Sequence, residues 1–305
     1  MNFSTPIKIA SFAYPIDYSS HTFFIGSCFA ENISKKFDYY KLKNTSNPFG
    51  VLFHSLAVEK IIQKAVQGIE FTSNDLLLSN ELWCSLDAHS ELSAIDKEQL
   101  LELLNQRLCQ TQAALQKATH ISITLGTSWI YKHLATNQIV ANCHKIPQRE
   151  FSKELLSVEQ IKESLERIIK LLPNKQIFFT ISPVRHIKDG FFENNLSKAH
   201  LFAALNQVLG DQAHYFPAYE IIMDELRDYR FFAADMLHPN QLAIDYVWER
   251  FSENYLSAKA LDTSKEIAAI QKALQHKAFN PDTLQHQQFV AATQKRIEAL
   301  GELWY

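Results

Sequence analysis

Three short apolar runs constrain the fold of this chain more than any other feature. They lie at residues 22–25, 120–125 and 176–181, and each is rich in β-branched or aromatic residues and bounded by Gly, Pro or Ser. Long helical stretches, at residues 96–119 and 157–172 among others, separate them. Strands that alternate with helices form βαβ units and a parallel sheet. With two weaker strands expected at 40–43 and 214–216, the sequence predicts an α/β fold, a three-layer α/β/α sandwich with a mostly parallel, about five-stranded sheet.

Two segments depart from this alternation. Residues 129–132 and 138–141 flank Ala135-Thr136-Asn137, which predicts a β-ribbon insertion near 129–145. A stretch at 241–256 has helical spacing, and two further helical segments follow between 262 and 304, broken at Phe279-Asn280-Pro281-Asp282. We therefore expect an α/β domain over residues 1–256 and a C-terminal helical hairpin over 257–305. The hairpin either packs on the sheet domain or mediates contact in a homo-oligomer.

Composition excludes several classes of function. A net charge of −3 over 305 residues gives no basic patch, so we expect no nucleic-acid partner. No apolar run approaches the length of a membrane span, and the first residues lack the pattern of a signal peptide. The four cysteines show no CxxC spacing. We therefore expect reduced thiols and a cytoplasmic protein.

Two short strings, 211 residues apart, contain the candidate catalytic residues. Ser27 stands where the first apolar run ends and a helical stretch begins, and Asp235-Met236-Leu237-His238-Pro239 precedes another helix. A hydroxyl needs a base to become a nucleophile, and the base needs an orienting acid. Ser27 alone favours a helix N-cap, and His238 alone a loop histidine before a proline. Together with Asp235 they predict a nucleophile, a general base and an orienting carboxylate.

The strings also resemble a known family. Gly26-Ser27-Cys28-Phe29-Ala30 is similar to the string that names the GSCFA family, a branch of the SGNH (GDSL-like) hydrolases. The other matching blocks are Leu125-Gly126-Thr127-Ser128-Trp129-Ile130-Tyr131, Asn142-Cys143-His144-Lys145, Ser182-Pro183-Val184-Arg185-His186 and the Asp-Met-Leu-His-Pro string. The resemblance covers roughly residues 20–255 and leaves the residues beyond 255 outside it. It implies an SGNH-hydrolase-like, flavodoxin-like fold and a Ser-His-Asp plan, with no cofactor and no known substrate.

The resemblance implies an oxyanion hole but also shows a departure. The Ser27 N–H is the first expected donor, and a helix N-terminus suits a developing negative charge. In the wider SGNH class the block after the second core strand reads Gly-x-Asn-Asp, whereas Ser128 holds the asparagine position here. Ser128 or Thr127 then substitutes, or Asn142 reaches in, or the enzyme is slow. Gly50 is either a second backbone donor or a plain turn residue.

Further polar residues are expected around the pocket. Asn142 and His144 are expected at its rim, contacting substrate, with an alternating ribbon strand as the alternative. Adjacent residues on a strand point to opposite faces, so Cys143 and His144 do not predict a metal site. Arg185 and His186 follow a strand and suit an anion or a sugar oxygen, with a solvated loop as the alternative.

One lysine and its surroundings leave alternatives open. Lys198 either faces the same cavity or is an exposed helix residue. Residues 188–195, just before it, read as a mobile loop over the site.

The expected function is that of a serine esterase or acyl hydrolase, acting on a small-molecule or carbohydrate acyl ester. An acyl transferase would differ only in its acceptor. The alternative is a catalytically weak or inactive SGNH-like domain that binds a glycan, a lipid or a protein. The missing asparagine favours this alternative, and the intact Ser27, Asp235 and His238 oppose it.

Overall fold

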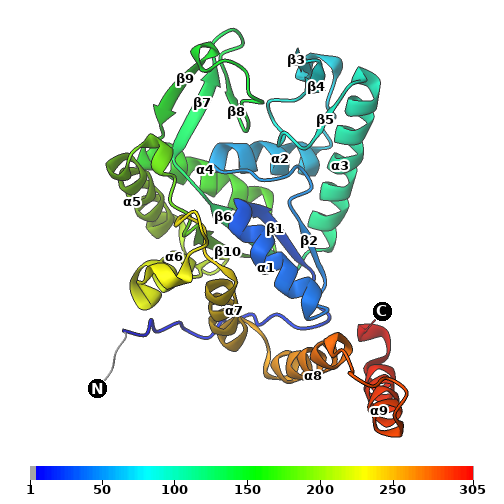
Figure 1. Cartoon of the computed structure of the whole chain (residues 1–305). Helices are drawn as coiled ribbons and strands as arrows, with labels where there is room; N and C mark the ends of the chain where they lie inside the picture. Colours follow the sequence, from blue (N-terminus) through cyan, green and yellow to red (C-terminus); the bar gives the residue numbers. More distant parts are fainter. Residues whose placement is uncertain (1–4, 305) are drawn as a thin grey trace.

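A five-stranded, all-parallel sheet forms the centre of the computed structural model, which describes residues 5–304 (Figure 1). The strand order is β2-β1-β6-β10-β11. The bounds are β1 Thr22–Gly26, β2 Asn44–Ser46, β6 His120–Leu125, β10 Gln176–Ile181 and β11 Ala213–Tyr215. Every residue of β1 and β6 is buried, as expected for central strands covered on both faces. The predicted α/β fold is confirmed.

Helices cover both faces of the sheet and make the sandwich three layers deep. Alternate side chains of β1 enter different cores: Phe23 and Ile25 pack with the helices of one face, and Phe24 packs with those of the other. The first face carries α2 Ser55–Gln67, α3 Lys97–Lys117, α4 Val158–Leu171 and α5 Phe191–Val208. The second carries α1 Cys28–Tyr39, α6 Ala218–Glu220, a π-helical turn Ile221–Leu226 and α7 Gln241–Tyr255.

The second strand lies later than the sequence predicted. Residues 40–43 close helix α1 instead: the Leu42 N–H donates to the Phe37 carbonyl, and Lys41 has a φ of 59°. This tight turn satisfies carbonyls of the last helical turn before the chain extends. The strand that follows, β2, consists of Asn44, Thr45 and Ser46, which is a polar sequence suited to a sheet edge.

Two small antiparallel sheets stand on the same side of the molecule, beyond α2 in Figure 1. The predicted ribbon region contains β7 Trp129–His133 and β8 Gln138–Val140, and β7 also pairs with β9 Phe151–Leu155, which the sequence did not predict. The second sheet, β3 Leu77–Ser79, β4 Leu82–Cys84 and β5 Ser93–Ala94, was also not predicted. Short 3-10 helices lie at Ser73–Asp75, Gln148–Glu150, Ile187–Asp189, Tyr229–Phe231 and Gly301–Leu303.

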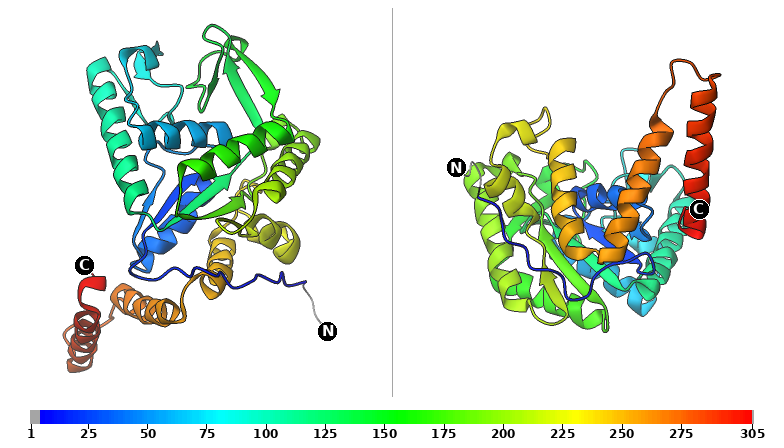
Figure 2. Two further views of the ribbon diagram at one scale, coloured as in Figure 1. Left: turned by 180° about the vertical axis from the view of Figure 1, so that it is seen from behind. Right: turned by 90° about the horizontal axis from the view of Figure 1, so that it is seen from below.

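The C-terminal helices α8 Ala258–Gln275 and α9 Leu284–Leu300 stand to one side of the sheet domain (Figure 2). Arg296 holds them together through a two-pronged ion pair with Glu266, at 2.6 and 3.0 Å. Gln271 ties α8 to the end of α1 through a hydrogen bond to the Tyr39 carbonyl. Among residues 5–304, no helix has both the length and the apolar character that crossing a membrane would require.

Candidate active site

Asp235 and His238 form a hydrogen-bonded pair on the loop before α7. The His238 Nδ1 lies 2.6 Å from the Asp235 Oδ2, while the other carboxylate oxygen accepts the N–H groups of Leu237 and His238 at 2.9 and 3.0 Å. These backbone hydrogen bonds, with the imidazole adding to them, lower the pKa of Asp235 to about 2. The carboxylate therefore stays ionised and holds the ring by Nδ1. The His238 side chain is 49% exposed, and its Nε2 is left for another partner.

Arg185 anchors this loop to the end of β10. Its guanidinium donates to the Met236 carbonyl, inside the Asp-Met-Leu-His string, and lies over the rings of Tyr229 and Phe232 at 5.3 and 5.0 Å. These contacts tie Arg185 to the loop that carries His238, while its Nε has no hydrogen-bond partner in the described chain. The expected role of Arg185 in binding a ligand stays a prediction.

Ser27 lies at the junction of β1 and α1, completely buried. It occupies the N-cap position, yet its side chain makes no capping hydrogen bond, and its Oγ has no hydrogen-bond partner in the described chain. The ordinary capping explanation for this serine therefore does not apply. Native structures rarely leave a buried hydroxyl unpaired, and such groups ask for an explanation. No hydrogen bond joins Ser27 to His238 in this structure.

Gly126 lies beside Ser27, and the Phe53 ring lies beside Gly126. A Cβ on Gly126 would lie 3.3 Å from the Ser27 Cβ and 3.1 Å from Cδ1 of Phe53. The Phe53 ring meets the His186 ring edge to face, with 5.6 Å between centroids. Burial first, and then the charges of Lys198 and His238, lowers the pKa of His186 to about 4. His186 thus contacts Phe53 and lies within range of the charge of His238.

A cavity of about 250 Å³ opens beside Phe53 and His186, between the ribbon and the strand ends. Its lining includes the predicted residues Thr127, Asn142 and His186, together with Phe53 and Trp129. Ligands of open α/β sheets bind outside the carboxyl ends of strands, and this cavity has that position. It is the candidate substrate pocket.

Two protein-family descriptions match this chain, one over residues 21–251 and one over residues 256–304. Residues 21–251 match the GSCFA family. The chain belongs to this family. Residues 256–304 match a second description, "GSCFA domain protein, C-terminal domain". The residues beyond 255, which the sequence analysis left outside the resemblance, are therefore also typical of GSCFA proteins. A search of curated proteins found no match.

The structure corrects the oxyanion donors expected from the GSCFA resemblance. The Ser27 N–H donates to the Thr124 carbonyl at 2.9 Å, as part of the sheet. The Gly50 N–H donates to the Asn47 carbonyl at 2.8 Å, and the φ of Gly50 is 71°, so Gly50 is a turn residue. The Ser128 hydroxyl, which is fully buried, donates to the Ser197 carbonyl at 2.7 Å. All three expected donors are already occupied.

Thr127 is the fourth oxyanion candidate. It lines the pocket, but its hydroxyl lies 3.0 Å from the Ser197 hydroxyl and accepts the Trp129 N–H. The N–H groups of Cys28 and Phe29 lie in the first turn of α1, where a helix leaves its N–H groups without helical partners, and both act to lower the pKa of the Cys28 thiol.

His144 is also corrected. Residues 142–145 form a turn rather than a strand, with His144 at a φ of 47°. Its ring is buried, and Nε2 lies 2.7 and 3.0 Å from the carbonyls of Ser85 and Ala88. His144 therefore fastens the 85–88 loop and does not line the pocket. Asn142 lines the pocket and accepts the His144 N–H. In the described residues, no group of three His, Cys, Asp or Glu side chains is arranged to hold a metal.

Helix α5 contributes buried polar residues that the sequence analysis missed or left open. Asn194 accepts the His186 N–H, and Ser197 accepts the Ser128 N–H. Lys198 donates to the carbonyls of Gly126 and Ser182. The expected mobile loop at 188–195 is therefore mostly the first turn of α5, which starts at Phe191. Three polar residues within five positions were the only signal of this face in the sequence.

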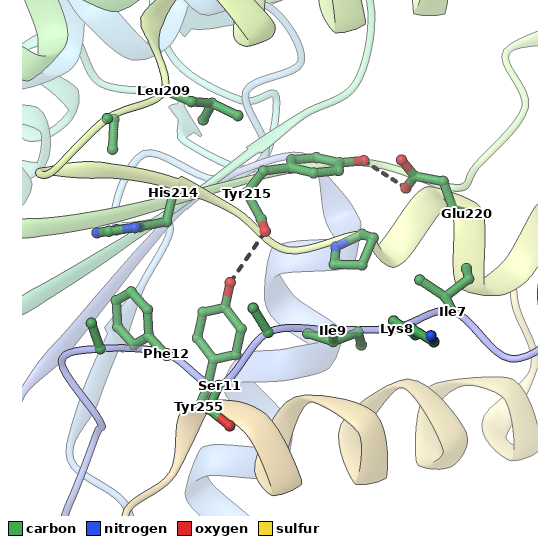
Figure 3. A pocket seen from close by; sticks show the side chains of 15 residues that line it. Ile7, Lys8, Ile9, Ser11, Phe12, Leu209, His214, Tyr215, Glu220 and Tyr255 are labelled. Atoms are coloured by element: carbon green, nitrogen blue, oxygen red, sulfur yellow. Dashed lines mark hydrogen bonds between the residues drawn. The ribbon is translucent and has the colours of Figure 1, made fainter.

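A second hollow, of about 570 Å³, lies along β11 at the edge of the sheet (Figure 3). The N-terminal segment runs past it, and Tyr255 of α7 points across to donate to the Tyr215 carbonyl. The Tyr215 hydroxyl in turn donates to Glu220 at 2.7 Å. These contacts link segments that are distant in the sequence, and none of the residues matching the GSCFA catalytic plan lines this hollow.

Proposed function

We propose that this protein is a serine-dependent hydrolase or transferase of carboxylic esters. Ser27 attacks the acyl carbon, His238 takes the hydroxyl proton on Nε2 and returns it to the leaving alcohol, and Asp235 holds the ring. Water, or an acceptor alcohol, then releases the acyl group. The observation that carries this proposal is the Asp235–His238 pair, because two backbone hydrogen bonds fix the carboxylate that presents the imidazole.

Catalysis by this route requires a local rearrangement. Ser27 is fully buried, whereas His238 stands exposed on its loop. We propose that a shift of the Phe53 and His186 rings opens Ser27 to the 250 Å³ cavity that these rings already line. Movements that complete an active site when substrate binds are common in enzymes.

The cavity suggests the class of substrate. Its wall combines the aromatic residues Trp129 and Tyr131 with the amide of Asn142. Flat rings beside a hydrogen-bonding amide suit a sugar or another small, partly polar alcohol. We therefore propose a small acylated molecule, such as an acylated carbohydrate, as the substrate.

The test is covalent labelling by a fluorophosphonate, together with hydrolysis of short-chain nitrophenyl esters. We expect the wild-type protein to be labelled on the peptide that contains Ser27 and to hydrolyse the esters, and Ser27→Ala to do neither. Cys28→Ala is the matched control, because it removes the neighbouring thiol and keeps the hydroxyl. Labelling that persists in Ser27→Ala and disappears in Cys28→Ala would assign the nucleophile to the thiol instead.

The occupied oxyanion donors favour a second candidate function. The N–H groups of Ser27 and Gly50 and the Ser128 hydroxyl are all engaged elsewhere. A domain of this kind could bind a glycan, a lipid or a protein without catalysis. Absence of labelling and of ester hydrolysis between pH 5 and 9 in folded protein would favour this function over the first.

Two further proposals concern the setting of the protein. All four cysteines are free, which supports a reducing compartment such as the cytoplasm. Helix α9 presents exposed apolar side chains, among them Leu284, Phe289 and Val290, which supports a role of the C-terminal helices in self-association. Sizing of the full chain against a chain ending at Ser257 tests the second proposal, with a smaller assembly expected after truncation.

A further inference from the structure

Lys198 is a lysine whose ammonium group lies inside the protein. The residue is 2% exposed, and its Nζ donates to the carbonyls of Gly126 and Ser182, each at 2.7 Å. These carbonyls belong to the residues that directly follow β6 and β10. The side chain thus reaches from α5 to the carboxyl edge of the sheet, where the candidate active site lies.

The charge of Lys198 has no carboxylate partner in the described part of the chain. Burial lowers its pKa to about 7, and the Cys28 side chain acts on that pKa in the opposite direction. Two neutral carbonyls do not compensate for taking an ammonium ion out of water, and an apolar side chain of similar volume would often be no less stable there. The position of Lys198 therefore calls for a role other than stability.

Lys198 reaches the surroundings of Ser27 through Gly126: its Nζ donates to the Gly126 carbonyl, and a Cβ on Gly126 would lie 3.3 Å from the Ser27 Cβ. Burial raises the pKa of the Cys28 thiol, while the Lys198 charge and the N–H groups of Cys28 and Phe29 act in the opposite direction. The Lys198 ammonium and the first turn of α1 thus both act on the residue that follows Ser27. Both stabilise negative charge, and an ammonium with two hydrogen bonds to carbonyls still has a third N–H to donate.

We propose that Lys198 is a catalytic residue that donates its third N–H to the oxyanion formed when Ser27 attacks an acyl carbon, an inference that rests on the proposed function. In this step the Ser27 Oγ bonds to the carbon, and the electron pair of the carbonyl double bond moves to its oxygen. The hydroxyl proton passes to the His238 Nε2. Lys198 neither gains nor loses a proton. When the oxyanion collapses, the alkoxide leaves and takes the proton from His238.

This assignment answers the departure at Ser128. The asparagine donor of the wider SGNH class is missing, and the serine in its place is engaged by the Ser197 carbonyl. Lys198 lies one helical position beyond Ser197 and is bonded to Gly126, the glycine of the same block. A charged donor thus stands next to the position that a neutral amide would otherwise fill. Hydrogen bonds with a charged partner are roughly twice as strong as neutral ones.

The experiment compares fluorophosphonate labelling rates and ester hydrolysis of wild type, Lys198→Met and Lys64→Met. Lys64, on α2, is the matched control: it is only 9% exposed, and its ammonium group lies over the Phe71 ring. Loss of an oxyanion donor typically lowers kcat about 10²–10³-fold, so we expect that loss in Lys198→Met with KM changed less than about threefold. Lys64→Met should label and turn over like wild type, whatever its stability.

The outcomes separate the two proposals. If wild type is labelled on Ser27 and folded Lys198→Met is labelled within threefold of its rate, the role of Lys198 is wrong and that of Ser27 stands. If folded wild type is neither labelled nor active, the proposed function is wrong and this inference is wrong with it.

If Lys198→Met does not fold, the pH dependence of labelling in the wild-type protein tests the role of Lys198 instead. The titratable groups that face Lys198 are Cys28 from α1, Tyr219 from α6 and His186 from the loop after β10. Because the ammonium form is the one that donates, the labelling rate should decline on the alkaline side with an apparent pKa near 7. A rate that still rises between pH 7 and 9 would show that the charged lysine is not needed.

Discussion

Arg185 holds Met236: its guanidinium, at the end of β10, donates to the carbonyl in the middle of the Asp235–His238 loop. The contact connects the core of the sheet with a loop whose two key side chains are about half exposed. Since Met236 has a φ of 60°, the loop turns sharply between the carboxylate and the imidazole. We therefore expect the position of His238 to depend on Arg185, which contacts the loop and not the imidazole.

Replacing Arg185 should lower activity through position alone. In Arg185→Gln the loop loses its anchor, and displacement of a catalytic group by about 1 Å can lower rates on the order of 10²-fold. We expect kcat to fall by that order, with little change in the thermal midpoint, because the contact is on the surface. Steady-state hydrolysis of nitrophenyl esters measures the first quantity and circular dichroism the second. Unchanged kcat in Arg185→Gln would show that the loop keeps its place without the arginine.

Asp235→Asn tests the orienting carboxylate. An amide can still accept the backbone N–H groups, but it cannot hold the same imidazole tautomer, and the equivalent change in known triads lowers kcat on the order of 10⁴-fold. Asp228→Asn is the control, because Asp228 is another exposed carboxylate that caps a turn on the same segment, through the Arg230 N–H. If both variants lose activity equally, the effect belongs to the turn and not to the histidine.

Asp235 should not limit activity in acid. Its pKa is lowered to about 2, so the carboxylate is ionised at any pH where the protein is assayed. A depressed carboxyl pKa supports the folded loop above the unfolded value of about 4, and that support is lost as pH falls through about 2. The pH profile of kcat/KM should therefore show no ionisation of Asp235 between pH 3 and 5. An acid limb in that range that is present in wild type and absent in Asp235→Asn would contradict this expectation.

His54 should make stability depend on pH. Its buried ring caps α2 by accepting the Ala57 N–H, and burial lowers its pKa to about 4. Between that value and about 6.5 the unfolded chain binds a proton that the folded protein does not, so stability rises with pH across this window. The difference amounts to about 3 kcal/mol at most. His54→Asn keeps an N-cap acceptor but does not titrate, and urea unfolding at pH 5 and pH 7.5 should show a smaller difference in the variant.

Gly126→Ala tests the packing between Gly126, Phe53 and Ser27. The added methyl would meet the Phe53 carbonyl at 3.2 Å as well as its ring and the Ser27 Cβ, and overpacking of this kind typically destabilises by about 1–3 kcal/mol. We expect slower fluorophosphonate labelling and a lower thermal midpoint. Gly210→Ala is the control, because nothing lies within 4 Å of its Cβ position. Equal behaviour of the two variants would show that Gly126 has room to spare.

The sequence predicted the central strands because burial on both faces requires an unbroken apolar run, and β1, β6 and β10 each have one. It misplaced β2, whose three residues are all polar, and missed β9, whose alternation is weak. Short edge strands are determined by their neighbours in space, which a local pattern does not show.

The same distinction applies to the candidate site: local relationships could be predicted from the sequence, and contacts set by the fold could not. Asp235 and His238 meet because they are three residues apart on one tight loop, a local relationship. Donors such as the N–H groups of Ser27 and Gly50 were misassigned because their acceptors, Thr124 and Asn47, are fixed by the fold. Lys198 could not be placed, since burial of a lysine contradicts the usual preference of that residue for solvent.

Trapping of the acyl-enzyme identifies the nucleophile. Wild-type protein is mixed with nitrophenyl acetate, quenched in acid and digested, and the masses of the peptides are compared with those of His238→Ala. We expect one acetyl group on the wild-type peptide that contains Ser27, on the serine itself, and almost none in the variant. Acetylation of the Cys28 thiol alone, or equal acetylation of Ser27 in both proteins, would contradict the proposed function.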